Sequence, residues 1–304
     1  MTSNRKLRGL AALFGLALVV NVAAQDVATV AYTPLGKLDL LSMPSDVALG
    51  ADGQIYVVDG GNHQIAVFDA AGTRVTSVGM HGDEDGQLNG PVGIGISSRG
   101  EIYVADRGNQ RVVMFAADGS PRRVIDLEED GEEATPIDVA VSPNGKELFI
   151  TTNNSHRVLV YSNKGTFLRA WGGEGEDPGQ FRFPGAIALD RAGNVYVVDV
   201  LNSRVQKFDP NGNILGTFGK RGGKPGTFFR PKGVTVDSGG LIYISDSYLG
   251  VVQVLSPAGE FLHTLGDADG TTIFETPVGM AVDGHRLLVA EMLPGRVQIL
   301  ELQK

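Results

Sequence analysis

The sequence predicts an all-β fold: a six-bladed β-propeller whose blades are four-stranded antiparallel sheets. Three observations predict it. A proline precedes a short apolar stretch six times, at intervals of 45 to 48 residues. Each interval holds four β-branched or aromatic stretches separated by turns rich in Gly, Asn and Asp, which is typical of a propeller blade. Small and large side chains alternate after each proline. The six prolines are Pro44, Pro91, Pro136, Pro184, Pro231 and Pro277.

The repeat that begins at Pro184 shows the four expected strands. Residues 187–189 and 195–198 predict the first and second strands, joined by a turn at residues 191–193. Residues 204–208 predict the third strand, and a turn containing Asn211 and Gly212 leads to the fourth. The second strand is apolar on both faces, as expected of a sheet packed between two neighbouring blades.

The alternation after the prolines predicts which strand of each blade lies innermost. The second and fourth residues after each proline are mostly Gly or Ala, as at Gly93 and Gly95. Small side chains on one face allow six strands to converge on an axis, while the larger alternate residues pack against a neighbouring blade. Asp46 and Asp138 depart from this pattern, because each places a carboxyl group at the second position.

The last repeat predicts how the ring closes. Only two residues follow its expected third strand, residues 297–302, so its fourth strand must come from elsewhere. Residues 28–33 precede the first repeat and end in Pro34-Leu35-Gly36, much as fourth strands end in Phe218-Gly219. We therefore expect this N-terminal strand to complete the last blade and remove the open edges of the ring.

Residues 1–24 have the pattern of an export signal. Arg5, Lys6 and Arg8 precede an apolar stretch too short to span a membrane comfortably, and Ala24 ends a small-residue cleavage site. An uncleaved anchor is the alternative. Cleavage would leave a propeller of residues 25–304 in the periplasm or outside the cell, with no membrane span.

Composition excludes several classes of function. The chain of 304 residues has no cysteine, so disulfides, thiolate metal sites and cysteine nucleophiles are absent. Its formal charge of −9 would become −12 once the three signal cations were removed. Such a chain, which lacks a long basic run, is not expected to bind nucleic acid.

The repeats resemble the NHL family, in which an apolar strand ending in Asp precedes a loop carrying Asn and then Arg. Residues 103–106 with Asn109-Gln110-Arg111, and residues 196–199 with Asn202-Ser203-Arg204, carry this pattern. The fifth and sixth repeats depart from it, with Leu249 and Val251 in place of Asn and Arg. The resemblance implies a propeller and most often a protein-binding role, although propellers host many functions. The recurring Asp and Arg are interpreted as a structural pair that caps each loop.

Asp46 and Asp138 are the candidate metal ligands. Two carboxylates near a pore mouth would take a hard divalent cation, preferably calcium, if main-chain oxygens or Glu133 completed the shell. The alternative is that each carboxylate accepts hydrogen bonds from neighbouring main-chain N–H groups. Sugar-lactonase-like propellers bind a central divalent ion, but their Glu and Asn ligand pattern is not visible here. No other cofactor is predicted.

The face that carries the loops between second and third strands and the inter-blade linkers is the candidate docking surface. It presents charges of both signs and exposed apolar residues, which suits protein recognition. Arg107, Arg230, Lys232 and Tyr248 are the predicted binding residues.

The leading functional hypothesis is an exported, non-catalytic binding or scaffold module, expected to be a monomer with a protein partner. The alternative is a metal-dependent lyase or lactonase-type hydrolase with its site in the central pore. The His-rich pore of peptide-amidating lyases is not reproduced, because none of the five His residues falls on an innermost strand. Ionisable groups with perturbed pKa values in the pore would favour the enzyme, and a pore of Gly, Ala and Val would favour the binding module.

Overall fold

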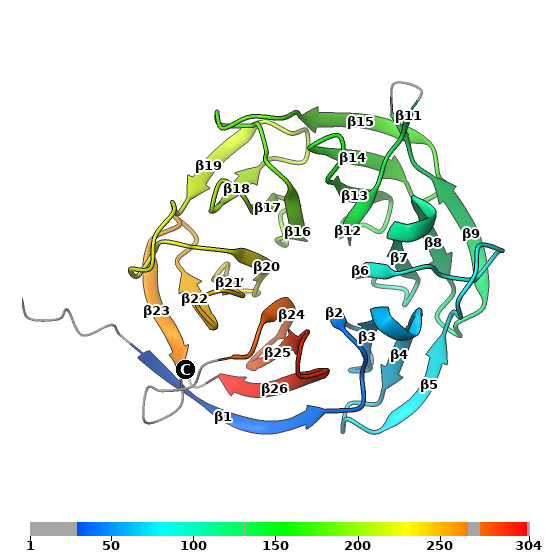
Figure 1. Cartoon of the computed structure of the whole chain (residues 1–304), viewed down its shortest axis with the longest axis horizontal. Coiled ribbons are helices and arrows are strands. Elements are labelled where there is room, and N and C mark those ends of the chain that lie inside the picture. The colour runs from blue at the N-terminus through cyan, green and yellow to red at the C-terminus, as the bar shows by residue number, and fades with distance from the viewer. Residues whose placement is uncertain (1–28, 130–131, 267–273, 303–304) are drawn as a thin grey trace, which may run out of the picture.

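A computed structural model describes residues 29–129, 132–266 and 274–302 and confirms the six-bladed propeller (Figure 1). The predicted signal peptide, residues 1–24, lies outside the described residues. Two 3-10 turns, Gly60–Asn62 and Arg107–Asn109, are the helical segments among them. In the same part of the chain, no helix has the length and apolar character needed to cross a membrane.

Five blades follow one another in sequence, each with its first strand innermost (Figure 1). Blade 1 contains β2 (Pro44–Leu49), β3 (Ile55–Asp59), β4 (Gln64–Phe68) and β5 (Arg74–Val78). Blade 2 contains β6 (Pro91–Ile96), β7 (Ile102–Asp106), β8 (Arg111–Phe115) and β9 (Pro121–Asp126). Blade 3 contains β12 (Pro136–Val141), β13 (Glu147–Thr152), β14 (Arg157–Ser162) and β15 (Phe167–Gly172). Blade 4 contains β16 (Pro184–Leu189), β17 (Val195–Asp199), β18 (Arg204–Phe208) and β19 (Ile214–Phe218). Blade 5 contains β20 (Pro231–Val236), β21 (Ile242–Asp246), β22 (Val251–Leu255) and β23 (Phe261–Gly266).

The sixth blade is assembled from both ends of the chain. Strands β24 (Pro277–Asp283), β25 (Arg286–Glu291) and β26 (Arg296–Leu302) are completed by β1 (Thr29–Leu38), which pairs antiparallel with β26. The predicted closure is therefore confirmed. The closing strand is longer than expected, because it continues past Pro34 to Leu38 through a register shift between Pro34 and Gly36. Its first residues also pair in parallel with β23, which joins the last two blades.

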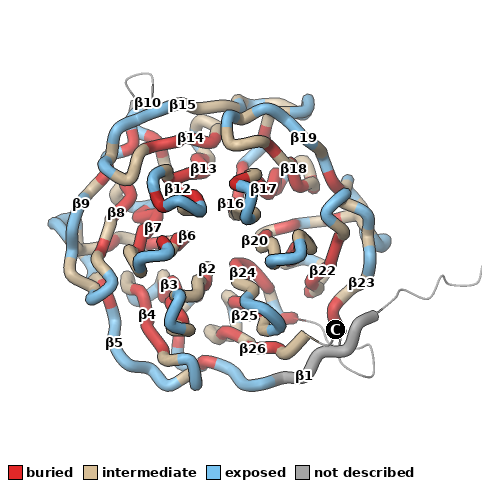
Figure 2. The backbone as a smooth tube through the Cα atoms, turned by 180° about the vertical axis from the view of Figure 1, so that it is seen from behind, coloured by how far each residue is buried: buried red, intermediate tan, exposed pale blue. Residues whose placement is uncertain are grey.

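The hydrophobic core is divided into six clusters, one between each pair of neighbouring blades. The cluster between blades 1 and 2, for example, contains Val58, Ile65, Ile94 and Val104. Second strands such as β3 and β7 are buried along their whole length, whereas outermost strands such as β5 are largely exposed (Figure 2). Burial on both faces explains why the second strands have no polar side in the sequence.

The innermost strands have free edges that face the axis. In each blade the first strand pairs with the second strand, starting at the proline. The register of this pairing shifts within three residues after the proline, as between Pro44 and Val47. Among the residues that the structure describes, no further strand pairs with the axial edge of the innermost strands. Main-chain N–H groups on this edge need other acceptors, since buried unpaired donors are costly.

Candidate functional site

The Asp and Arg of the NHL-like pattern form structural clips, as expected. In blade 2, the Asp106 carboxylate accepts hydrogen bonds from Asn89 N, Asn109 Nδ2 and Arg111 Nε, at 2.6, 2.7 and 3.0 Å. The Arg111 guanidinium also donates to the main-chain oxygens of the preceding linker. Such clips fasten the preceding linker to its blade, as Asp199 with Arg204 does in blade 4, and their carboxylates are occupied by these bonds.

The predicted docking residues on the loop face do not form one cluster. Arg107 lies on the 3-10 turn of blade 2, whereas Arg230 and Tyr248 lie at blade 5, across the ring (Figure 1). Tyr248 is 63% exposed and stacks on Phe229, with ring centroids 4.1 Å apart. The Arg221 guanidinium covers the Phe229 ring at 4.9 Å. Lys232, the fourth candidate, lies in the pore.

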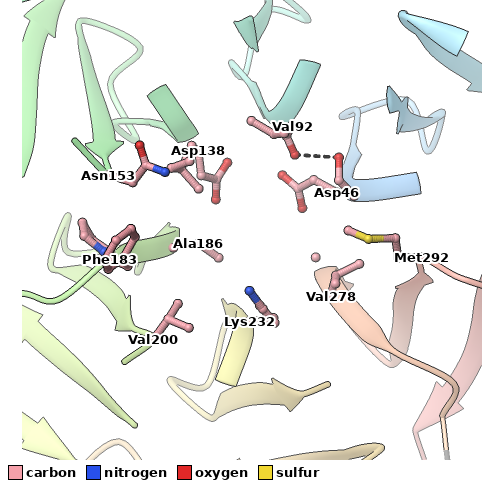
Figure 3. A pocket seen from close by; sticks show the side chains of 15 residues that line it. Asp46, Val92, Asp138, Asn153, Phe183, Ala186, Val200, Lys232, Val278 and Met292 are labelled. Carbon is pink, nitrogen blue, oxygen red and sulfur yellow. Dashed lines mark hydrogen bonds between the residues drawn. The ribbon is translucent and has the colours of Figure 1, made fainter. Parts of the chain in front are cut away.

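A cavity of about 250 Å³ opens at the loop-side mouth of the pore. A second cavity, of about 330 Å³, continues along the innermost strands. Asp46 and Asp138 line both cavities and therefore stand at the boundary between them. In Figure 3 their carboxyl groups point toward each other across the pore.

The residue directly after each blade proline lines the mouth cavity in every blade. Five of these residues are small or apolar without charge, and Lys232 is the single cation among them. The six residues are Ser45, Val92, Ile137, Gly185, Lys232 and Val278. The sequence analysis considered the second and fourth positions after each proline and did not compare the first position. The signal was present in the repeat, because Lys232 is the single charged residue among the six at this position.

The remaining wall of the cavity comes from loops. Phe183 lies in the linker before blade 4, and Asn153, Val200 and Met292 lie just after second strands. The sequence indicated Met292 as an exposed apolar residue of the loop face but did not place these four residues in one cavity. Nothing in their local pattern separates them from other loop residues, because only ring closure brings them to one mouth.

The two pore carboxylates accept hydrogen bonds from the free edges of the innermost strands. Asp46 Oδ1 accepts from its neighbour Val47 N at 2.9 Å, and Asp46 Oδ2 accepts from Ile94 N of the next blade at 3.0 Å. Asp138 makes the equivalent pair of bonds, to Val139 N at 2.7 Å and to Ile187 N at 2.9 Å. The structural alternative offered for these residues is therefore confirmed, yet each oxygen keeps a second lone pair.

Glycine on the neighbouring strands makes room for both carboxyl groups. A Cβ on Gly93 would collide with the side chain and main chain of Asp138. A Cβ on Gly279 would likewise collide with Asp46. The Gly positions that narrow the ring in sequence thus also let the two acids approach the axis.

Burial raises the pKa of both acids. For Asp46, desolvation and the negative charge of Asp138 raise the pKa well above its ordinary value. For Asp138, desolvation outweighs the lowering effect of the N–H donors and raises the pKa to about 6. The proximity of the two carboxyl groups contributes to both values. Both acids therefore hold a proton more readily than a free aspartic acid, and ionisation of Asp138 disfavours ionisation of Asp46.

Lys232 completes the set of perturbed groups. Its amine points into the mouth cavity, beyond the two acids (Figure 3). Desolvation, and then the nearby charge of Arg230, lower the pKa of Lys232. The pore thus holds two acids with raised pKa values and one amine with a lowered value, which is the feature expected of a catalytic site.

The pore donor set does not fit a resident calcium ion. Calcium takes 6–8 oxygen ligands, whereas the pair offers at most four carboxylate oxygens, each of which also accepts a main-chain N–H group. The Lys232 amine shares the cavity and would repel a cation. Within residues 29–129, 132–266 and 274–302, no three His, Asp or Glu side chains gather as a metal site. Glu133 is not among the residues that line the cavity. A calcium ion at Asp46 and Asp138 stays a prediction.

Solved structures of similar shape are six-bladed propellers with distant sequences. Virginiamycin B lyase from Staphylococcus aureus is 14% identical, with a TM-score of 0.63 over 90% of this chain and 100% of that one. A gluconolactonase from Xanthomonas campestris is 16% identical, with a TM-score of 0.68 over 91% and 96%. A protein of unknown function from Bacteroides thetaiotaomicron is 17% identical, with a TM-score of 0.68 over 91% and 76%. At these identities the likeness shows the fold alone.

Comparison of the sequence with protein families is more specific. No curated protein matches this chain. The family model described as the SMP-30/gluconolactonase/LRE-like region matches residues 44–273. The predicted propeller is thereby supported, although the family that matches is not named for the NHL repeat. The chain belongs to the SMP-30/gluconolactonase/LRE-like family.

Proposed function

We propose that this protein is a hydrolase for lactones, with its active site at the loop-side mouth of the pore. The observation that carries the proposal is the pair of facing carboxyl groups, Asp46 and Asp138, which line one cavity and have raised pKa values. Pairs of titratable groups whose environments push their pKa values apart are typical of acid–base catalysis. Membership of a family that includes gluconolactonases supports the same reaction class.

In the proposed hydrolysis, Asp138 is the general base and Asp46 is the general acid. Asp138, ionised above a pKa of about 6, accepts a proton from water while the water oxygen bonds to the lactone carbonyl carbon. The bond between that carbon and the ring oxygen then breaks, and protonated Asp46 supplies the proton to the departing oxygen. Lactone and water become one hydroxy acid. Exchange with solvent water then removes the proton from Asp138 and returns one to Asp46, which restores the starting state.

Hydrolysis is favoured over the lyase reaction for a specific reason. A variant of the Staphylococcus aureus virginiamycin B lyase in which one His is replaced by Ala is described as catalytically inactive. Among the described residues of this chain, no His lines either pore cavity. Two acids that can exchange a proton suit addition of water instead.

The proposal replaces the leading hypothesis of a non-catalytic scaffold with its alternative. A pore lined only by Gly, Ala and Val would favour the binding module, but this pore contains Asp46, Asp138 and Lys232. The protein partner, the monomeric state, export and signal cleavage stay predictions.

The test is hydrolysis of dihydrocoumarin and gluconolactone by the purified protein, followed with a pH indicator, in the presence and absence of a chelator. We expect turnover that survives the chelator and that falls by about 100-fold or more in Asp138→Asn and in Asp46→Asn. The rate should rise with pH through about 6 as Asp138 ionises. Lys164→Met, on an exposed turn, serves as the control.

Three results would count against this function. They are the absence of hydrolysis of either lactone, full activity in Asp138→Asn, and activity that a chelator removes and calcium restores. The last result would instead support the predicted metal at Asp46 and Asp138. Melting curves of both Asn variants would show whether a loss of rate reflects unfolding.

A further inference from the structure

The linker between blades 4 and 5 differs in charge from its counterparts. Three linkers make the same isolated bridge, His81 with Leu88, Glu174 with Phe181 and Arg221 with Phe228, so their residues can be compared by position. Where the linker before blade 2 has Glu84 and that before blade 4 has Asp177, this one has Lys224. The same turn is thus acidic in two linkers and basic in the third.

The basic linker continues into the pore. Arg230 ends the linker, and Lys232 lies two residues later with its amine in the mouth cavity. Among the described residues, no carboxylate lies within ion-pair distance of any cation of this set, whereas Arg204 and Arg296 on the same face are paired with Asp199 and Glu291. The set, here called the basic strip, consists of Lys220, Arg221, Lys224, Arg230 and Lys232.

The inner end of the basic strip, at Lys232, has no negatively charged group paired with it among the described residues. Lys232 is partly buried, and the charge of Arg230 is close enough to lower its pKa further. A buried cation with only a like-charged neighbour is unfavourable, and an anion between the two would offset that cost. The protein as a whole is acidic, so the strip forms a local attractive field for anions.

Apart from Lys232, the two acids, Ser45 and Asn153, the cavity is lined by apolar residues and glycine. Val200, Val278, Met292 and Phe183 line it, and Lys232 stands across the pore from the two acids (Figure 3). A ligand that fills this space therefore needs one anionic group and an apolar body. Its reacting group would lie at Asp46 and Asp138 while its anionic group lies at Lys232.

We propose that the substrate is a small carboxylate-bearing molecule with an apolar body, whose carboxylate is held by Lys232 with Arg230 and guided there by the basic strip. The placement of its reacting group rests on the proposed lactone hydrolysis. The anion site itself does not, because it depends only on Lys232, Arg230 and the apolar wall.

The test is calorimetric binding of 3-phenylpropanoate and its uncharged amide, 3-phenylpropanamide, to the intact protein. Neither contains a lactone, so the measurement is independent of catalysis. We expect the carboxylate to bind about 10-fold more tightly, the effect of one favourable charge interaction in a partly buried site. Lys232→Met should remove this difference, and Lys232→Arg should retain most of it. Lys164→Met, an exposed lysine on a turn of blade 3, is the matched control.

Salt provides a second readout. Raising the ionic strength from about 0.01 M to about 1 M shortens electrostatic range from about 30 Å to about 3 Å, so binding of the carboxylate should weaken while binding of the amide should not. Equal affinity for the two probes would overturn the inference, as would an unchanged preference in a folded Lys232→Met protein. If the carboxylate binds as expected but no lactone is hydrolysed, the anion site stands and the proposed reaction fails. If lactones are hydrolysed but the two probes bind alike, the reaction stands and the anion site fails.

Discussion

Two sets of buried carboxylates in this propeller have opposite surroundings. At the ends of the second strands, Asp106 and Asp199 are fully buried and each bonds to an Arg, an Asn and a main-chain N–H. In the pore, Asp46 and Asp138 bond to main-chain N–H groups and face each other, with no cation within ion-pair distance among the described residues. The first set recurs around the ring, and the second occurs in two blades only.

The difference shows that the partners of a buried acid, rather than burial itself, decide its role. A carboxylate that accepts a charge-assisted bond from Arg has its oxygens committed to that contact. A carboxylate beside a second carboxylate has a raised pKa and can transfer a proton near neutral pH. The clips therefore stabilise the ring, and the pore pair is available for chemistry.

The largest expected effect is on stability, from breaking a clip. Arg111→Met should lower the free energy of unfolding by about 3–5 kcal/mol, because it leaves the Asp106 charge buried without its cation. Chemical denaturation measures the change, and lactone turnover per folded molecule should stay the same. Arg182→Met is the matched control, since its ion pair with Glu176 is exposed and should be worth less than about 1 kcal/mol. Equal effects of the two substitutions would remove the distinction between buried and exposed pairs.

The second effect comes from filling the space beside Asp138. Gly93→Ala should destabilise the protein by about 1–3 kcal/mol, because the added Cβ meets Asp138 and the main chain of Ile137. It should also displace the acid and reduce lactone turnover in the protein that remains folded. Gly36→Ala, whose added Cβ has no atom within 4 Å, is the control for both measurements. Normal turnover in Gly93→Ala would show that catalysis does not depend on the position of Asp138.

The third effect, similar in size to the second, is a pH dependence of stability that differs between buried and exposed carboxylates. Because the pKa of Asp138 is raised on folding, its ionisation destabilises the folded state, and this cost grows as pH rises toward and through about 6. The melting temperature of Asp138→Asn, relative to the unmodified protein, should therefore increase between about pH 4 and pH 7, by an amount equivalent to about 1–3 kcal/mol.

Asp118 offers the opposite case for comparison. Its pKa is lowered by hydrogen bonds from Ser120, so its ionised form stabilises the folded state and that stabilisation is lost as the pH falls. The relative melting temperature of Asp118→Asn should therefore decrease as pH rises over the acidic range. A pH-independent difference for Asp138→Asn would mean that its carboxyl group titrates as it does in the unfolded chain.

The sequence by itself determined the architecture and the structural clips. Proline spacing, alternating strands and the recurring Asp and Arg are local patterns that repeat along the chain, so each repeat independently indicates the same blade structure. The absence of a fourth strand in the last repeat indicated closure by the N-terminal strand. Asp46 and Asp138 were also visible, because each breaks the pattern of Gly and Ala.

Only the tertiary structure decided what those acids do. Asp46 and Asp138 are separated by one intervening blade, and their raised pKa values depend on the ring bringing both to one axis past Gly93. The placement of Lys232 with Phe183, Val200 and Met292 in one cavity likewise required closure. A pKa depends on distance and desolvation in three dimensions, and neither quantity is contained in the spacing of residues along a chain.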